Sequence, residues 1–222
     1  MGVTIHYQGH LSDPQQLPEL ITAIQHTCRK LNWPHIDVNE RIIGTAEMLV
    51  YHTGAETEDQ RWVSETMPVD DRWRGVIVSP PGSEPLWLTF NRSGRMIVYD
   101  ANDTSFVSPG HYLAREQLFT KTQFSSAETH IAICDLLRLA EQHGAELEVA
   151  DEGGYWETGD VGTLQQRLGF IDSALAQMKK EGDKMLEEAP ETKPEGEIEV
   201  GKVIERALPD WRRSWGISAG EN

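Results

Sequence analysis

Carboxylates, aromatic rings and glycines are concentrated in residues 151–160 of this 222-residue chain. The segment contains three glycines, the acids Asp151, Glu152, Glu157 and Asp160, and the aromatic residues Tyr155 and Trp156. Closely spaced carboxylates can bind a hard cation such as Mg²⁺ or Ca²⁺. Two of them can also divide into an acid and a base when their surroundings shift their pKa values apart. The spacing differs from that of a calcium-binding loop, which begins with a D-x-D-x-D-G run.

The same segment also has a purely structural interpretation. Gly153 and Gly154 can form a hairpin turn. Tyr155 and Trp156 then lie on the returning strand, and Asp160 caps the helix that follows. The other acids would be solvated. Large aromatic side chains beside charges are typical of recognition surfaces, so we expect Trp156 to be partly exposed and to contribute to binding.

A second polar set consists of Lys121, Gln123 and His130. Alternation along a predicted strand at 118–124 places Lys121 and Gln123 on one polar face, and His130 follows one turn into the next predicted helix. If this strand lies beside the strand that ends near Asp151, the set converges with Asp151 and Glu152. A lysine near carboxylates can bind an anion or take part in acid–base catalysis. The alternative is an isolated polar face of a strand.

Motifs that identify common enzyme classes are absent from the sequence. It contains no G-x-S-x-G, no P-loop and no G-x-G-x-x-G. Cys28 and Cys134 belong to no C-x-x-C motif, and the histidines lack H-x-H and H-E-x-x-H spacing, which argues against a zinc site. Both cysteines lie among apolar residues of predicted helices, so we interpret them as buried free thiols. The sequence predicts neither a metal nor a cofactor.

A hydrophobic stripe follows an acidic linker near the end of the sequence. Residues 187–197 are rich in Pro and Glu and contain no large apolar side chain, a composition typical of disordered linkers. Apolar residues then recur at helical spacing and form one face: Ile204, Leu208, Trp211 and Trp215. Because these side chains favour burial, we predict that residues 198–222 dock either on their own domain or in a groove of a partner.

Strand and helix patterns alternate through the rest of the chain. Alternating apolar residues at 3–8 predict a strand. Apolar residues at helical spacing predict helices over 13–31, 125–143 and 160–178, while residues 53–72 are polar and are expected to form a loop. The sequence therefore predicts an α+β fold: a mixed, largely antiparallel sheet covered by three main helices, with a tethered C-terminal helical segment.

The net charge of −16 restricts the possible partners. A strongly anionic protein is repelled by nucleic acid and by anionic membranes, and no stripe of Lys and Arg offsets this charge. We therefore expect neither a nucleic acid nor a membrane as partner. The first residues resemble no secretory signal, and no apolar run approaches the roughly 18 residues of a membrane span, which predicts a cytoplasmic protein.

These observations favour a non-enzymatic accessory protein that recognises a protein partner. We predict a globular domain at 1–186, the linker at 187–197 and the docking segment at 198–222. The partner is expected to contact Tyr155, Trp156 and the apolar stripe of the docking segment.

The alternative is an enzyme of unassigned class, such as a metal-assisted hydrolase that uses the carboxylates of residues 151–160. Its candidate catalytic residues are Asp151, Glu152, Glu157, Lys121 and His130. Acids that converge in a pocket would favour the enzyme, whereas acids spread over a convex turn would favour the binding protein.

Overall fold

The computed structural model describes residues 3–53, 60–100, 110–169 and 180. One compact unit extends through Leu168, and a second begins at Gly169. The predicted linker at 187–197 and docking segment at 198–222 lie outside the described residues.

The first strand of the chain occupies the middle of a three-stranded antiparallel sheet. The sheet consists, in spatial order, of β7 (Leu118–Lys121), β1 (Thr4–Leu11) and β8 (Ala145–Asp151). Along β1, Ile5 and Tyr7 are buried and His6 is exposed, which is the alternation predicted from the sequence. The register pairs Ile5 with Asp151 at the end of β8, so β1 aligns the segment that contains the candidate acids.

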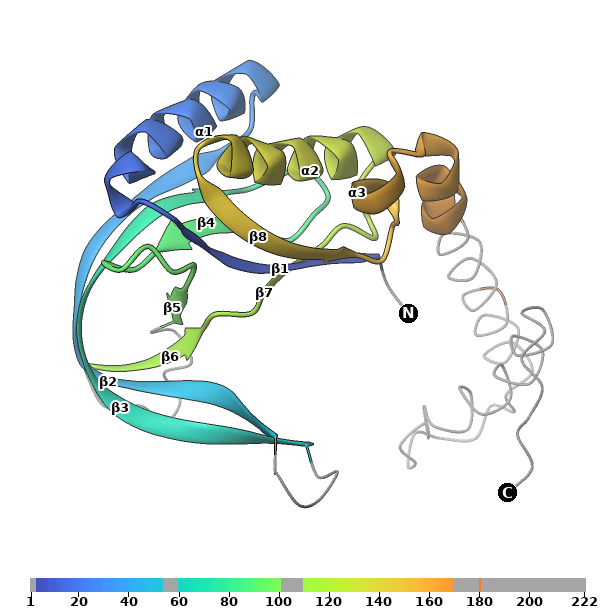
Figure 1. The fold of residues 1–222 in the computed structure, drawn as a ribbon. Coiled ribbons are helices and arrows are strands. Elements are labelled where there is room, and N and C mark those ends of the chain that lie inside the picture. Colours follow the sequence, from blue (N-terminus) through green and yellow to red (C-terminus); the bar gives the residue numbers. More distant parts are fainter. Residues whose placement is uncertain (1–2, 54–59, 101–109, 170–179, 181–222) are drawn as a thin grey trace, which may run out of the picture. The chain divides into compact units, whose positions relative to one another are not determined.

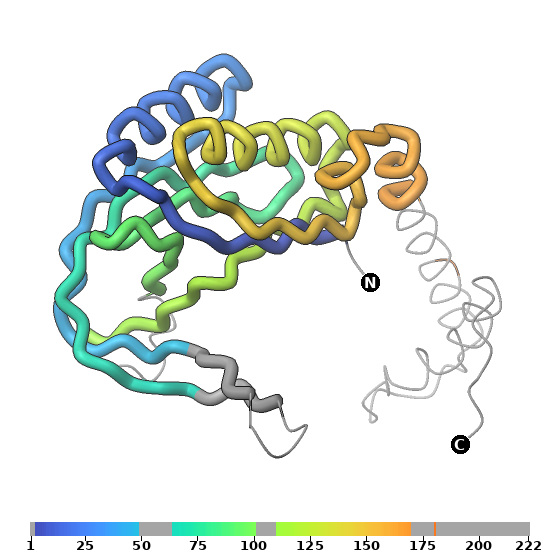
Figure 2. The backbone as a smooth tube through the Cα atoms, viewed as in Figure 1, coloured from blue at the N-terminus to red at the C-terminus, as the bar shows by residue number. Residues whose placement is uncertain are grey.

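A second, mixed sheet contains two long strands. Its members, in spatial order, are β4 (Leu86–Phe90), β3 (Gln60–Val78), β2 (His35–Thr53), β6 (His111–Arg115) and β5 (Val98–Asp100). β2 and β6 run parallel, and the other described neighbours run antiparallel. Figure 2 shows that the β2–β3 ribbon is strongly curved. Gly44 lies in this ribbon at φ 149°, and a Cβ atom there would overlap the carbonyl oxygen of Gly110, so this close approach requires glycine.

Helices cover one side of the three-stranded sheet (Figure 1). They are η1 (Pro14–Gln16), α1 (Leu17–Leu31), α2 (Ala127–Gln142) and the single turn α3 (Tyr155–Thr158), followed by helical residues 161–169. α1 contacts α2 and β3, and α2 contacts β8. The stripe that predicted α1 is buried at Leu20, Ile24 and Cys28. The α+β class and the mixed, largely antiparallel pairing predicted from the sequence are confirmed.

One segment differs clearly from its prediction. Residues 53–72 were expected to form a polar loop, but β3 begins at Gln60 and pairs with β2 along its whole length. Residues 64–68 are all exposed, and no other described helix or strand buries them. Backbone hydrogen bonds to β2 define this part of the strand, and no alternation of buried side chains marks it in the sequence.

Candidate functional site

The carboxylate of Asp151 organises the turn that follows β8. Its side chain is fully buried, and its Oδ1 accepts the N–H of Gly153 at 2.7 Å. Its Oδ2 accepts the N–H groups of Tyr155 at 2.8 Å and Trp156 at 3.0 Å. The ring Nε2 of His130 lies 3.1 Å from the same oxygen. One carboxylate therefore satisfies the free N–H groups at the start of α3 and also holds a histidine on α2.

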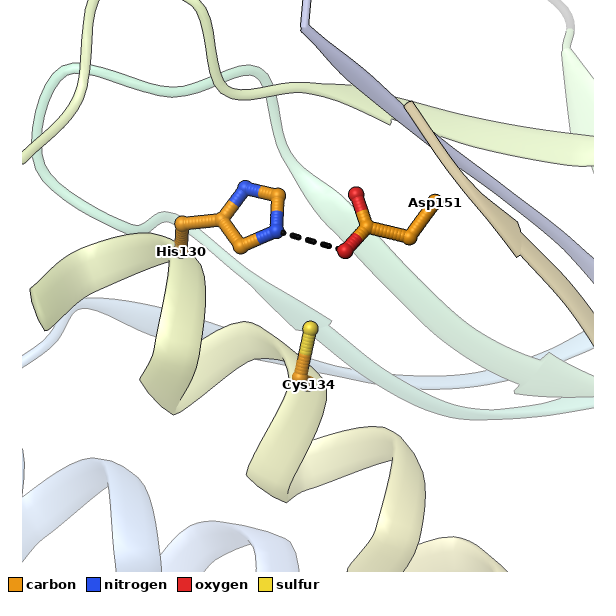
Figure 3. Close-up of side chains that lie close together, drawn as sticks. All are labelled: His130, Cys134 and Asp151. Atoms are coloured by element: carbon orange, nitrogen blue, oxygen red, sulfur yellow. Dashed lines mark hydrogen bonds and ion pairs between the residues drawn. The ribbon is translucent and has the colours of Figure 1, made fainter. Parts of the chain in front are cut away.

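The His130 ring joins Asp151, to which it bonds in Figure 3, to Thr122, the residue that directly follows β7. Its Nδ1 lies 2.8 Å from Oγ1 of Thr122, and the His130 side chain is fully buried. Burial alone would raise the pKa of the Asp151 carboxyl, but the hydrogen bonds from His130 and from backbone N–H groups outweigh it and lower this pKa. Because the ionised carboxylate can only accept, the Nε2–H group of His130 donates the hydrogen bond to Asp151.

Cys134 completes a buried cluster with this pair. It lies four residues after His130 on α2, and one ligand-type atom from each of His130, Cys134 and Asp151 falls within 4.8 Å of the others. Burial, followed by the nearby negative charge of Asp151, raises the pKa of the Cys134 thiol. A catalytic cysteine needs an accessible thiolate, whereas this thiol is fully buried and its pKa is raised.

The donor types in this cluster could hold a zinc-like cation, but their existing bonds oppose it. Oδ2 of Asp151 already accepts three donors, including Nε2 of His130. A cation bound to these atoms would have to displace the histidine proton and compete with the backbone N–H groups that Oδ2 accepts. The arrangement fits a structural junction better than a metal centre. We call Thr122, His130, Cys134 and Asp151 the His–Asp junction.

Two glycines allow the backbone to close around the His–Asp junction. A Cβ atom on Gly153 would lie 2.8 Å from Cε1 of His130 and 2.9 Å from both Oδ1 of Asp151 and Cδ1 of Leu164. Gly154 adopts φ 74°, a left-handed conformation that glycine accepts without strain. The two glycines therefore permit α3 to start directly over the carboxylate. The strand predicted for Tyr155 and Trp156 is wrong. Both N–H groups donate to the Asp151 carboxylate, and this arrangement places the two residues in a helical turn.

The aromatic side chains of α3 pack on a cation from α2. The guanidinium carbon of Arg138 lies 5.5 Å from the ring centroid of Tyr155 and 5.1 Å from that of Trp156. Its Nη2 also donates to the carbonyl oxygen of Trp156 at 3.2 Å. Both aromatic residues are half-buried, so Trp156 is partly exposed as the sequence predicted. We call Arg138, Tyr155 and Trp156 the aromatic turn.

The remaining candidate catalytic residues do not converge. Lys121 lies on β7, and β1 separates β7 from β8, so the condition under which Lys121 would converge with Asp151 and Glu152 is not met. Its Nζ is 3.7 Å from Oε1 of Glu84. Glu152 is exposed and accepts the N–H of Thr4 at 2.9 Å. Its carboxylate therefore bonds to the backbone at the start of β1.

Glu157 and Asp160 also use their side chains locally. Glu157 is exposed, and its Oε1 accepts the N–H of Asp151 at 3.3 Å. Asp160 accepts the N–H of Gly162 at 2.8 Å and the hydroxyl of Thr163 at 2.6 Å, which lowers the pKa of its carboxyl. Asp160 thus caps the following helix, as predicted. The binding residues predicted in the tail, Leu208, Trp211 and Trp215, lie outside the described residues.

Sequence reasoning missed three members of these clusters, Thr122, Cys134 and Arg138. Cys134 follows His130 by four residues, a spacing that places both on one helical face, so the signal was present in the sequence. Arg138 continues the same face by another four residues. Nothing in the local sequence, however, indicates that α2 lies against the end of β8, because that contact depends on the tertiary fold.

Comparison with known proteins and inspection of the helices add two findings. Across the described residues, no helix has the length and apolar character needed to cross a membrane. Comparisons with protein-family models, curated proteins and solved structures gave no significant match to this chain.

Proposed function

We propose that this chain is a non-enzymatic accessory protein that binds a protein partner through the aromatic turn. The observation that carries the proposal is the position of the Arg138 guanidinium over the rings of both Tyr155 and Trp156. Tyr, Trp and Arg are the residue types that contribute most to the binding energy of protein interfaces. Here all three are adjacent, and both rings are partly exposed.

The His–Asp junction supports this proposal by holding the aromatic turn rigid. The N–H groups of Tyr155 and Trp156 both bond to the buried carboxylate of Asp151. A surface that is ordered before binding loses less conformational entropy when the partner arrives. In this interpretation the junction acts through the turn and does not contact the partner itself.

The alternative of a hydrolase has less support from the same residues. Asp151, Glu152 and Glu157 each accept a backbone N–H group, and Lys121 pairs with Glu84, which lies just before β4. A general acid and a general base need to face a common space where a substrate can lie. Lys121 lies on β7, whereas the three acids lie at or beyond the end of β8 and bond to backbone groups, so these contacts do not point the four side chains toward a common substrate.

The C-terminal residues predicted to bind are also part of this proposal. We propose that Leu208, Trp211 and Trp215 add an apolar helical face that docks in a groove of the same partner. The net charge of −16 supports a protein in preference to nucleic acid. Two buried free thiols, Cys28 and Cys134, are consistent with a cytoplasmic compartment.

The test isolates the tagged chain from its own cells, identifies the associated protein by mass spectrometry and measures the affinity of the purified pair. Trp156→Ala should weaken that affinity by about 2 kcal/mol, which is roughly 30-fold. Arg138→Lys keeps the charge but loses the planar contact with the rings, so it should weaken binding as well.

The matched control is Ile36→Ala, which removes an apolar side chain that is 64% exposed on β2. It should leave the affinity unchanged. Melting curves of all variants exclude loss of folding as the cause. The proposal fails if the partner binds Trp156→Ala as tightly as the wild type, or if Ile36→Ala weakens binding equally.

A further inference from the structure

Four arginines line one cavity of about 410 Å³ between the first turn of α1 and the β2–β3 ribbon. They are Arg41, Arg72, Arg74 and Arg92, and Asn91 and Leu17 contribute to the wall. We call these four side chains the arginine pocket. Its volume lies within the range of roughly 300–1,000 Å³ that is usual for small-ligand sites. None of these residues belongs to the aromatic turn or to the His–Asp junction.

The sheet brings three of the cations onto one face. Arg41 on β2 and Arg72 on β3 are direct partners in the register. Arg74 follows Arg72 by two residues and therefore points to the same side of the sheet. Like charges placed directly opposite each other on paired strands are destabilising.

The fourth cation comes from the turn after β4. The backbone N–H of Arg92 donates to Oδ1 of Asp71 at 2.9 Å, which holds this turn against β3. Gly94 in the same turn has φ 86°, and a Cβ atom there would lie 3.0 Å from Cγ of Pro14 at the cavity. Glycine at this position lets the turn pack against the start of the helical segment.

Neighbouring acids neutralise this cluster only in part. Arg41 forms a bidentate pair with Asp70, and Arg92 lies 4.0 Å from the same carboxylate. Arg72 donates to the uncharged side-chain oxygen of Asn39 at 2.6 and 2.9 Å. Within the described part of the chain, no hydrogen bond or ion pair is found for the Arg74 side chain.

The second nearby carboxylate is bound by other groups. Oδ1 of Asp71 accepts backbone N–H groups from Arg72 and Arg92, and its Oδ2 accepts the hydroxyl of Tyr99 at 2.8 Å. It therefore forms no ion pair with any guanidinium of the pocket among the described contacts. Among the described residues, the four cations thus share a single ion-pairing acid, Asp70.

This concentration of positive charge is opposite in sign to the whole protein, whose net charge is −16. We propose that the arginine pocket binds a compact oxyanion that carries two or more negative charges. Guanidinium groups bind phosphate and carboxylate oxygens through paired hydrogen bonds, so several of them around one cavity match such a ligand. The acidic remainder of the surface repels extended polyanions, which favours a ligand small enough to fit within the cavity.

The experiment measures binding of inorganic pyrophosphate and of tricarballylate by titration calorimetry at constant ionic strength. The first probe presents phosphate oxygens and the second presents carboxylates, so their relative affinities show which chemistry the pocket prefers. The wild type should bind at least one of them saturably with one site per chain. Arg74→Gln and Arg92→Gln should each weaken that binding by about 10- to 100-fold, as expected when a charged hydrogen bond is lost.

The control is Arg29→Gln, which removes the same charge from the exposed last turn of α1. It should change the affinity by no more than about twofold, because an exposed charge at a distance is screened. Thermal melts verify that each variant is folded. The proposal is overturned if the wild type binds neither probe saturably, or if Arg29→Gln weakens binding as much as Arg74→Gln.

Discussion

The His–Asp junction and the arginine pocket both gather ionisable side chains, but they treat charge in opposite ways. In the junction, the carboxylate of Asp151 is fully buried and receives four hydrogen bonds. In the pocket, Arg92 is 67% exposed by side chain, and Arg74 has no partner in the described part of the chain. The first region satisfies its charge inside the protein, whereas the second leaves charge available at the surface.

This difference separates the two roles that charged residues can have in a fold. A buried charge destabilises the protein unless the fold provides bonding partners for it, so removing such a partner is costly. An exposed cluster of like charges gains little from the fold and slightly opposes it. Substitutions in the junction should therefore lower stability, and substitutions in the pocket should not.

The largest effect is expected from Asp151→Asn. This change removes the ionised acceptor of His130 and of three backbone N–H groups, and it should lower the free energy of unfolding by about 3 kcal/mol. Urea denaturation measures the loss. Asp37→Asn, on the exposed face of β2, is the control and should change stability by less than about 0.5 kcal/mol. If both variants lost the same stability, the buried carboxylate of Asp151 would matter no more to the fold than an exposed one.

The pH dependence of that difference tests whether the charge of Asp151 is responsible. Its carboxyl has a lowered pKa in the folded protein, so the ionised form is stabilised there relative to the unfolded chain. The stabilisation is fully present above the unfolded pKa of about 4 and is lost as the pH falls through the lower folded value. The stability gap between wild type and Asp151→Asn should be constant from about pH 5 to 7 and should shrink below about pH 4. A gap that stays constant in acid would assign the effect to packing.

A smaller loss is expected from Gly153→Ala, which adds one methyl group over the junction. The new carbon would lie 2.8 Å from the His130 ring and 2.9 Å from the Asp151 carboxylate, so the side chains must shift. Overpacking of this kind typically lowers stability by about 1–3 kcal/mol. Gly169→Ala is the matched control, because at this helical position a new Cβ meets no described atom within 4 Å. Thermal melts should show destabilisation only at Gly153.

The smallest effect is expected from Arg74→Gln, and its sign is opposite. Removing this cation relieves repulsion from Arg72 on the same strand face without breaking a described bond. The free energy of unfolding should stay constant or rise by up to about 0.5 kcal/mol. A chemical denaturation curve at low ionic strength gives the clearest reading, since salt screens the repulsion. A clear loss of stability would mean that Arg74 supports the fold and is not held available for a ligand.

Features that depend on local pattern could be predicted from the sequence. The apolar alternation of β1, the stripe of α1 and the cap formed by Asp160 are set by neighbouring residues, and the structure contains all three. The α+β class followed from the same patterns. The outer part of β3 could not be recognised, because its side chains are exposed and only pairing with β2 defines it.

The two charged regions depend on contacts between distant segments, so the sequence indicated them only in part. His130 and Asp151 were both predicted as candidate residues, but the contact between their side chains depends on how α2 packs against β8. Lys121 was grouped with them because β1 could not be placed between β7 and β8 from local pattern. The arginine pocket was missed because its members are spread over residues 41–92 and form no run of basic residues.

The central place of β1 has a consequence for the order in which this protein assembles. β1 pairs on both sides with strands that come much later in the chain, and the hydrogen bond from Thr4 to Glu152 joins residues 148 positions apart. During synthesis, β1 leaves the ribosome long before either neighbour exists, whereas the β2–β3 ribbon can pair at once. Closing such long loops is slow. We therefore expect the three-stranded sheet to form late in folding, after the chain has been synthesised as far as Asp151.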